Sequence, residues 1–361
     1  MEDLLAWSGL LGFTSKYGRR DTTVGLEKGI ILPFHKGKGS SRRDCKNYRG
    51  ITLLSVPGKA FAHILLARVK DRLLLLRRKE QTGFTPRRST IDRIITLTTL
   101  LQARREFRQP MWIAYIDLKA AFDSVDRAAL WALLLSIGIP RQIVDLIKEL
   151  DTDTMSAVRV DEMLSDWFRK DSGVRQGCAI APNIFLSPMD RILDHTVHRR
   201  QVGVSLGSET FSDLDFADDV ALLTEMLNVC ILAMEIMQEE AAIFGIEINW
   251  SKAKIQAVGT QHFPNVVHVA GNDVEVVDCF MYLSVQISND GSSKQEVRRR
   301  IAMTRDCFQV LQNNIWRSCI RMETKIRLLK AYVFQVLLYA AEKWPLTSEL
   351  EKKLDVCLQW A

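Results

Sequence analysis

The sequence predicts an α+β protein, because short apolar runs of strand length and longer segments with helical spacing follow one another along the chain. Trp112–Ile116 is a run typical of a buried strand, and apolar residues stand on both sides of Asp218-Asp219 as in a hairpin. Gly58–Arg78 instead places apolar residues three and four positions apart. At 361 residues the chain is long enough to bury a core and hold two or three subdomains.

The composition excludes several classes of protein. Hydrophobic residues make up 47% and charged residues 25%, which is ordinary for a globular protein and excludes a disordered one. The seven cysteines show no close pair and no zinc spacing, so we expect a reducing compartment and no disulfide framework. No apolar run approaches the ~18 residues of a membrane span, and the start is acidic, unlike a secretory signal. We therefore expect no membrane association and an intracellular localisation, in the nucleus or the cytoplasm or both.

The charge is distributed unevenly along the chain. The net charge is +6, but the amino-terminal third is strongly basic and residues 111–260 are acidic. This asymmetry indicates that one part binds a polyanion while another holds cations. Solvated charged faces are the alternative interpretation.

A basic loop and two helices are predicted in the amino-terminal third. Gly29–Pro33 predicts a strand, and the following loop from His35 to Arg49 carries basic side chains suited to phosphate contact, although a plain solvated loop would look similar. Ser89–Asp92 has the spacing of a capping box for a helix that runs to about Phe107. The helix before it has apolar residues predicted on one side, namely Phe61, Ile64, Leu65, Val69 and Leu73.

Asp117 directly follows the buried strand Trp112–Ile116, and a helix stopped by Gly138 begins soon after it. An acid at the end of a central strand is well placed for chemistry. The alternative is an acid that caps the helix, and Asp123 fits that role better than Asp117 does.

Gln176 lies between Gly173 and Gly177, after a hairpin predicted within residues 153–170 and before a helix. Glycines allow the backbone to approach a ligand, and the amide side chain can hydrogen-bond it. Glycine turns before helices are common, so this signal is weak alone. His195 and His198 lie three apart on the helix, but without further ligands they do not predict a metal site.

Asp218-Asp219 stands at the tip of the predicted hairpin Asp213–Leu223. Neighbouring carboxylates repel each other, and a hard cation such as Mg²⁺ would turn that repulsion into a binding site. The alternative is a solvated turn, because Asp favours turns. Asp117 and Asp218 can meet only if their two strands are neighbours in one sheet.

After residue 224 the sequence predicts a helix and a strand, then a boundary that is followed mainly by helices. Residues 224–244 predict a helix ended by Gly245, Ile255–Val258 predicts a strand, and a boundary is expected near residue 288. Ser293–Glu296 has the spacing of a second capping box, which would open a helix with a basic cluster at residues 298–300; another helix is expected over about 323–340.

Taken together, these segments resemble the reverse transcriptase of LINE-type (non-LTR) retrotransposons. The resemblance covers about residues 28–345 and is highly specific because the motifs occur together and in order. Its segments are Asn47–Ser55, Gln81–Pro86, Asp117–Asp123, Gly173–Cys178, Phe216–Asp219 and Asn249–Lys252.

The resemblance implies a right-hand polymerase. Its parts would be a poorly matched stub over 1–27, fingers over 28–111, a palm over 112–288 that includes part of the fingers near 140–170, and a partial helical thumb over 289–361.

The resemblance also implies a metal centre. Asp117 and Asp218 would bridge two Mg²⁺ ions, with Mn²⁺ as an alternative, and Asp219 would stand in the same cluster. Leu118 would lend a backbone carbonyl. Lys252 matches a lysine that protonates the leaving pyrophosphate, although a simple charge contact is an equal alternative.

Nucleotide contacts are implied for a second set of residues. Lys36 and Arg49 would neutralise triphosphate or template charge, and Gln176 would touch the incoming nucleotide or the template backbone, with Gly177 allowing close approach. Phe122 would press on C2′ of the sugar and exclude a 2′-hydroxyl; an aromatic packed beneath the sheet is the alternative.

The implied function is an RNA-directed DNA polymerase, a nucleotidyltransferase that uses an RNA template, a DNA primer and dNTPs. Arg87 and Ser284 stand where the family usually has glycine, and neither an endonuclease domain nor a cysteine-histidine knuckle is found, as expected of a truncated genomic copy. A non-catalytic nucleic-acid-binding remnant is the alternative. A carboxylate-based nuclease would leave Gln176 and the basic fingers without a role.

Overall fold

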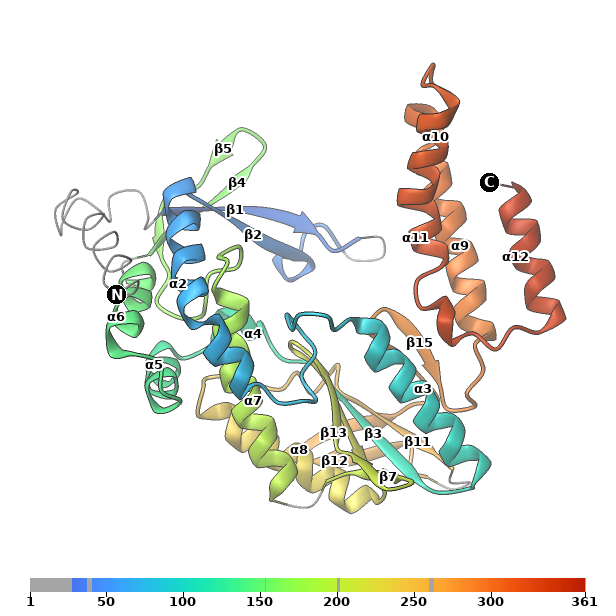
Figure 1. Ribbon diagram of the computed structural model, residues 1–361, viewed down its shortest axis with the longest axis horizontal. Helices are drawn as coiled ribbons and strands as arrows, with labels where there is room; N and C mark the ends of the chain where they lie inside the picture. The colour runs from blue at the N-terminus through green and yellow to red at the C-terminus, as the bar shows by residue number, and fades with distance from the viewer. Residues whose placement is uncertain (1–27, 38–40, 153, 200–201, 260–262, 361) are drawn as a thin grey trace, which may run out of the picture. The chain divides into compact units, whose positions relative to one another are not determined.

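A computed structural model describes residues 28–37, 41–152, 154–199, 202–259 and 263–360 (Figure 1). The predictions for 1–27 lie outside the described residues. The chain forms two units, each assembled from separate stretches. The first unit contains the described residues of Met1–Lys79, Leu118–His195 and Met237–Ile248; the second contains Glu80–Asp117, Thr196–Ile236 and the described residues of Asn249–Ala361. The predicted boundaries of fingers, palm and thumb stay a prediction.

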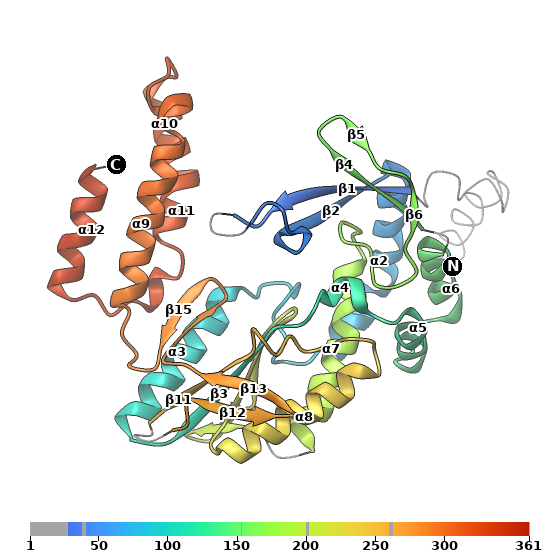
Figure 2. The same ribbon diagram turned by 180° about the vertical axis from the view of Figure 1, so that it is seen from behind.

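The first unit contains a five-stranded sheet in the order β2-β1-β4-β5, with β6 also paired to β4. β1 pairs antiparallel with β2 and parallel with β4, so a distant segment extends the amino-terminal hairpin (Figure 2). Its strands are β1 (Lys28–His35), β2 (Tyr48–Leu54), β4 (Met155–Val160), β5 (Met163–Leu164) and β6 (Phe168–Arg169). The predicted basic loop is therefore shorter than expected, because its end at Tyr48 and Arg49 is already strand β2, after a 3-10 turn at Cys45–Asn47.

Helices complete the first unit: α2 (Val56–Leu76), α4 (Ala121–Ser124), α5 (Arg127–Ser136), α6 (Arg141–Asp151) and α7 (Ala181–His198), whose last three residues belong to the second unit. The Ser55 hydroxyl caps α2 by accepting from Gly58 N at 3.2 Å. The buried side of α2 includes Ala62, Leu65, Val69 and Leu73, whereas Ile64 is 46% exposed. Leu65, Val69 and Leu73 lie on the buried side as predicted, and Phe61 is partly buried. The prediction was wrong for Ile64, since the helix turns Ala62 inward instead.

The second unit is built on a six-stranded sheet in the order β12-β13-β11-β3-β10-β9. Its strands are β3 (Met111–Ile116), β9 (Asp213–Phe216), β10 (Asp219–Thr224), β11 (Lys254–Val258), β12 (Val266–Val269) and β13 (Asn272–Val276). All six residues of β3 are buried, as predicted for a central strand. Two small hairpins join this unit, β7 (Val204–Leu206) with β8 (Glu209–Phe211) and β14 (Cys279–Tyr282) with β15 (Val285–Ser288).

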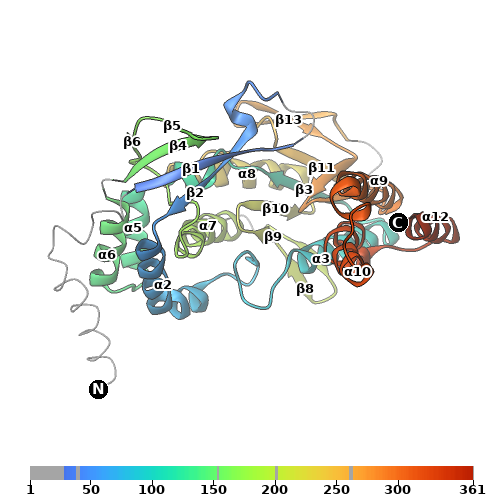
Figure 3. The same cartoon turned by 90° about the horizontal axis from the view of Figure 1, so that it is seen from above.

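Helix α3 (Thr90–Glu106) packs on one face of this sheet, and α8 (Leu227–Ala242), whose last residues belong to the first unit, lies on the other side of β3 (Figure 3). Leu97, Leu101, Ile113 and Tyr115 share one buried cluster between α3 and β3. The capping box predicted at Ser89 is confirmed, since Ser89 N donates to the Asp92 carboxylate at 2.8 Å.

The carboxyl-terminal helices form a small core of their own within the second unit. They are α9 (Lys294–Val310), a π turn at Gln312–Trp316, α10 (Met322–Leu328), a π turn at Leu329–Val333, α11 (Phe334–Leu337), a 3-10 turn at Ala341–Lys343 and α12 (Ser348–Trp360). Val297, Ile301, Leu337 and Trp344 meet in this core. No helix in the described part of the chain is long and apolar enough to cross a membrane.

The second predicted capping box is wrong although its helix is right. Ser293 makes no side-chain cap at the start of α9. Glu296 is fully buried and accepts from Arg299 Nε at 2.9 Å, Arg300 Nε at 2.7 Å and Gln286 N at 2.9 Å. These bonds hold the pKa of the Glu296 carboxyl below its usual value, against the opposing effect of burial. Two of the residues predicted as a basic cluster therefore neutralise a buried acid.

Candidate active site

Strand register brings the predicted metal acids to one end of the second unit's sheet. Val220 of β10 lies opposite Ile116 of β3, so the next position along places Asp219 beside Asp117. Asp219 also pairs with Phe216 of β9, which leaves Ala217 and Asp218 as a two-residue turn. The three acids therefore gather at one sheet end, as predicted if their strands were neighbours.

Asp117 is held by two residues that follow the helix α8. Asn249 Nδ2 and Lys252 Nζ each donate to Asp117 Oδ2 at 3.0 Å, and Asn249 N donates to the Asp117 carbonyl at 2.8 Å. The Asp117 side chain is 37% exposed and that of Lys252 is 62% exposed. Lys252 lies at the acids as predicted. Asn249 is a contact that no prediction assigned, although its segment carried the resemblance.

The donor set at this sheet end fits a hard divalent cation, because three carboxylates offer the oxygens that Mg²⁺ prefers. In the described residues, no three side chains of His, Cys, Asp or Glu converge as metal ligands. Asp117 is instead paired with Lys252. This end of the sheet thus offers carboxylate oxygens that are not converged on one point, and a lysine that supplies positive charge at one of the carboxylates.

The turn between β9 and β10 is held by a buried glutamine. Gln81 Oε1 accepts from Ala217 N and from Gly83 N, both at 2.8 Å, and Gln81 Nε2 donates to the Ala217 carbonyl at 3.2 Å. Gln81 is 1% exposed. Ala217 has φ of 60°, a left-handed conformation that costs a non-glycine residue about 1 kcal/mol. Sequence reasoning gave Gln81 no role beyond membership of a motif.

Gln176 occupies a loop of the first unit, where an acid engages its side chain. Gln176 Nε2 donates to Asp123 Oδ2 at 2.8 Å, and Lys170 Nζ pairs with the other oxygen of the same carboxylate. The alternative interpretation, in which an acid caps the following helix and Asp123 fits better than Asp117, does not hold for Asp123. Asp126 is the N-cap of α5, accepting from Ala129 N at 2.7 Å.

The two glycines beside Gln176 approach the protein's own backbone. A Cβ at Gly177 would lie 2.4 Å from the Thr52 carbonyl oxygen, and one at Gly173 would lie 2.5 Å from the Phe122 carbonyl oxygen. Both have positive φ. Packing within the unit accounts for both glycines. Gly177 was instead predicted to allow close approach of a nucleotide or template.

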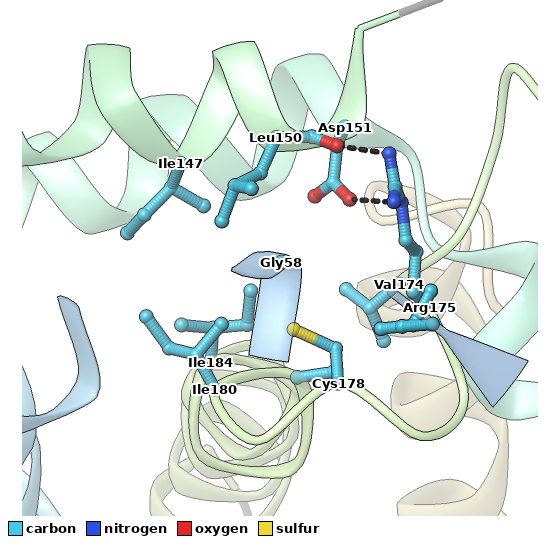
Figure 4. A pocket seen from close by; sticks show the side chains of 11 residues that line it. Gly58, Ile147, Leu150, Asp151, Val174, Arg175, Cys178, Ile180 and Ile184 are labelled. Atoms are coloured by element: carbon cyan, nitrogen blue, oxygen red, sulfur yellow. Dashed lines mark hydrogen bonds and ion pairs between the residues drawn. The ribbon is translucent and has the colours of Figure 1, made fainter. Parts of the chain in front are cut away.

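A buried ion pair anchors the same loop. Arg175 Nε lies 3.5 Å from Asp151 Oδ1, and Arg175 also donates to the Leu150 carbonyl (Figure 4). Asp151 is 7% exposed and Arg175 is 9% exposed. Burial raises the pKa of the Asp151 carboxyl, and the nearby Arg127 and Arg175 oppose that shift. Asp151 and Arg175 line a pocket, and Cys178 points into it (Figure 4). Burial raises the pKa of the Cys178 thiol.

Phe122 stacks on the fully buried Phe185, with ring centroids 4.2 Å apart and planes at 21°. Its own ring is only partly buried. The alternative that Phe122 is a packing residue is therefore supported by its contact with Phe185, while part of the ring stays accessible. Leu118, in the same unit, forms a backbone bridge with Ile248.

Lys36 and Arg49 share one face of the hairpin β1–β2. Phe34 lies opposite Arg49, and Lys36 N donates to the Asn47 carbonyl at 2.8 Å, so Lys36 follows Phe34 on the same face. Both side chains are exposed. The first unit thus brings together two of the predicted phosphate contacts, and Asp117, Asp218, Asp219 and Lys252 all belong to the second unit.

The chain matches the model of the family described as reverse transcriptase (RNA-dependent DNA polymerase) over residues 35–287. It is 23% identical over 321 residues to a retrovirus-related Pol polyprotein from type-1 retrotransposable element R2 of Popillia japonica, covering 86% of this chain and 44% of that protein. It is 27% identical over 225 residues to the transposon TX1 uncharacterized 149 kDa protein of Xenopus laevis, covering 62% and 17%. The chain therefore spans less than half the length of these relatives.

Solved structures show the same fold. Apo telomerase from Candida tropicalis is similar with a TM-score of 0.51 at 13% identity, over 97% of this chain and 66% of that chain. Candida tropicalis telomerase in complex with the TWJ fragment of telomeric RNA gives a TM-score of 0.50 at 14% identity, over 93% and 57%. The likeness confirms the predicted α+β right-hand polymerase fold.

The match over residues 35–287 contains both acidic segments, and the structure places these segments on paired strands. The resemblance to LINE-type retrotransposon enzymes is confirmed: this chain belongs to the reverse transcriptase (RNA-dependent DNA polymerase) family.

Proposed function

We propose that this chain catalyses RNA-directed DNA synthesis, extending a DNA primer with dNTPs on an RNA template. The observation that carries the proposal is the register of β3 and β10, which brings Asp117 beside Asp219 with Asp218 in the adjoining turn. Family membership over most of the chain supports this reaction.

Asp117, Asp218 and Asp219 would hold the divalent cations, for which we propose Mg²⁺, with the Leu118 carbonyl as a further oxygen. When bound, such ions activate the primer hydroxyl and stabilise the leaving pyrophosphate. Lys252, now 3.0 Å from Asp117 Oδ2, neutralises this acid and is within reach of a phosphate that binds there. Either a charge contact or a proton donated by Nζ would follow from that position.

The first unit would bind the nucleotide and the template. Lys36 and Arg49, exposed on one face of the β1–β2 hairpin, suit triphosphate or template phosphates. Gln176, oriented by Asp123, offers its remaining amide atoms to the nucleotide or the template backbone. Phe122, braced by Phe185, would exclude a 2′-hydroxyl.

The test is primer extension on an RNA template with Mg²⁺. Asp218→Asn keeps the side-chain shape and removes the charge, so we expect extension to fall by about 100-fold or more, as losses of groups that act as a unit do. Glu209→Gln removes an exposed carboxylate of the same unit, in β8, and should leave the rate unchanged.

Equal extension by Asp218→Asn and the wild-type chain would reject the metal assignment. Extension by neither, with RNA binding retained, would favour a nucleic-acid-binding remnant.

A further inference from the structure

We propose that Gln81 is a positioning residue for the turn of Ala217 and Asp218 between β9 and β10. By holding this turn, Gln81 fixes the orientation of the Asp218 and Asp219 carboxylates. This inference rests on the proposed function, because it concerns the same carboxylates. It adds a residue from the loop before α3, which touches none of the reacting atoms.

The side chain of Gln81 binds both backbone groups of one residue. Its Oε1 accepts from Ala217 N at 2.8 Å, and its Nε2 donates to the Ala217 carbonyl at 3.2 Å. An amide side chain is neutral and carries its donor and its acceptor on separate atoms of one planar group, as a peptide does. Gln81 therefore pairs with the first residue of the turn as a neighbouring strand would.

The surrounding backbone makes this contact rigid. Gly83 N also donates to Gln81 Oε1 at 2.8 Å, which fixes the carboxamide from a third side. Thr82 pairs with the Asp215 carbonyl through N at 3.1 Å and Oγ1 at 2.8 Å. Gln81 forms a parallel bridge with Asp215. The loop thus continues the sheet along β9 up to the turn.

The loop of Gln81–Gly83 packs closely against the turn at Ala217. A Cβ at Gly83 would lie 2.3 Å from Ala217 N and 2.8 Å from Ala217 Cα. Gln81 and Thr82 are each 1% exposed, so water cannot replace their bonds. Only a glycine at position 83 lets the loop touch the turn.

Asp218 lies within the turn, so the conformation of the turn affects where its carboxylate points. Asp218 is the second of two residues between paired positions Phe216 and Asp219, directly after Ala217 with its φ of 60°. If Ala217 lost its partner, the peptide between Ala217 and Asp218 could rotate while both strands stayed paired. A displacement of about 1 Å at a catalytic group can cost on the order of 100-fold in rate.

The experiment compares Gln81→Ala with Gln256→Ala. Gln256 is also fully buried in the second unit, and its amide also makes three bonds, to the Tyr115 hydroxyl and to the Asp278 and Ile287 carbonyls. It lies in β11, where Ile113 of β3 is its partner, away from the turn. Both variants lose the same kind of group, and only one loses it at the acids.

Two readouts, kcat and Mn²⁺ affinity, are expected to separate the variants, while the melting temperature should not. For Gln81→Ala, kcat for primer extension should fall about 30- to 100-fold with the dNTP KM changed less than about threefold. Mn²⁺ affinity of the free protein, measured by electron paramagnetic resonance, should fall about tenfold. Gln256→Ala should lower the melting temperature to a similar degree while keeping kcat and Mn²⁺ affinity.

Gln81→Glu provides a second variant that keeps more of the fold. Its carboxylate can accept from Ala217 N and Gly83 N, and donates to the Ala217 carbonyl only when protonated. Its kcat relative to wild type should therefore rise as pH falls from 8.5 to 6.5, whereas the relative kcat of Gln81→Ala should stay flat. If Gln81→Ala does not fold, this pH profile decides.

Wild-type kcat and Mn²⁺ affinity in Gln81→Ala, with extension still dependent on Asp218, would overturn the inference and leave the proposed function intact. A flat relative profile for Gln81→Glu would also overturn it. If the wild-type chain extends no primer, the proposed function fails and the Mn²⁺ titration decides alone. Unchanged Mn²⁺ affinity in Gln81→Ala, or no Mn²⁺ binding by wild type, would then count against positioning.

Discussion

The two loops that carry site residues are held in opposite ways. In the second unit, the turn before Asp219 is fixed by a neutral amide that binds backbone, with Gln81 paired to Ala217. In the first unit, the loop of Gln176 is fixed by a buried ion pair between Arg175 and Asp151. One anchor resembles a sheet, and the other depends on two charges.

The difference follows from what each loop presents. Gln81 is neutral, so it adds no further charge beside the metal acids, where the acid Asp215 is already fully buried. The loop of Gln176 has no cluster of acids to protect, and a buried pair there can tolerate the cost of desolvation with hydrogen bonds from Arg127 and Arg175 to backbone. We expect the first unit to be the more sensitive to pH at its anchor.

Breaking the ion pair should have the largest effect on stability. Arg175→Met removes the ion-pair partner of the buried Asp151, so the free energy of unfolding should fall by about 3–5 kcal/mol. The control Arg169→Met breaks an exposed pair with Asp171 and should cost about 0–1 kcal/mol. Denaturant unfolding measures both.

The pH dependence of this variant has a definite sign. Burial already raises the pKa of Asp151, and loss of Arg175 raises it further, so the folded state binds the proton more tightly than the unfolded chain does. The penalty of Arg175→Met should therefore grow as pH rises from about 4 to 8. A penalty that is equal at both ends would contradict the ionic anchor.

Phe122→Ala should give an intermediate effect and separate the duties of the two units. Removal of the ring should lower the preference for dNTPs over rNTPs by about 10- to 200-fold, the range for differences in pocket fit. The Mg²⁺ concentration for half-maximal extension should stay unchanged, because the metal acids belong to the other unit. Phe122→Leu is the matched control, since it keeps most of the bulk.

Single-nucleotide incorporation with each nucleotide class measures this preference. Unchanged discrimination in Phe122→Ala would show that the ring only packs on Phe185.

The smallest effects are expected where backbone strain is relieved in the second unit. Arg87 has φ of 62° and Ser284 has φ of 63°, a region of backbone conformation that glycine adopts without strain. Arg87→Gly and Ser284→Gly should each raise the free energy of unfolding by about 0.5–1 kcal/mol. Thermal melting checks the direction, and Arg88→Gly is a neighbouring control at a position without positive φ, where stability should not rise. A loss in either variant would mean that its side chain matters more than its backbone.

Much of the fold could be predicted from local pattern. The strand Trp112–Ile116 and the cap at Ser89 depend on residues close in sequence, and both form as expected. Strand β2 was missed because Gly50 and Arg49 suggest a loop, and only pairing with β1 makes it a strand. The cap at Ser293 failed because distant Gln286 and nearby arginines compete for Glu296.

The candidate site divides along the same line. The gathering of Asp117 with Asp219 was predicted as conditional on neighbouring strands, and the register meets that condition. The roles of Gln81 and Asn249 could not be predicted, because each contacts a residue more than a hundred positions away. Both lay in segments of the resemblance, which gave the only available signal.

Gly83 shows how intolerance to substitution can arise without chemistry. Any side chain there would collide with Ala217, so a mutational scan of activity should find position 83 as restricted as the aspartates themselves. An added proton, metal or nucleotide would rescue none of its variants. A second substitution at Ala217 could not make space for a side chain at position 83, because the collision is with the backbone atoms of Ala217. Selection would therefore keep this glycine by geometry alone.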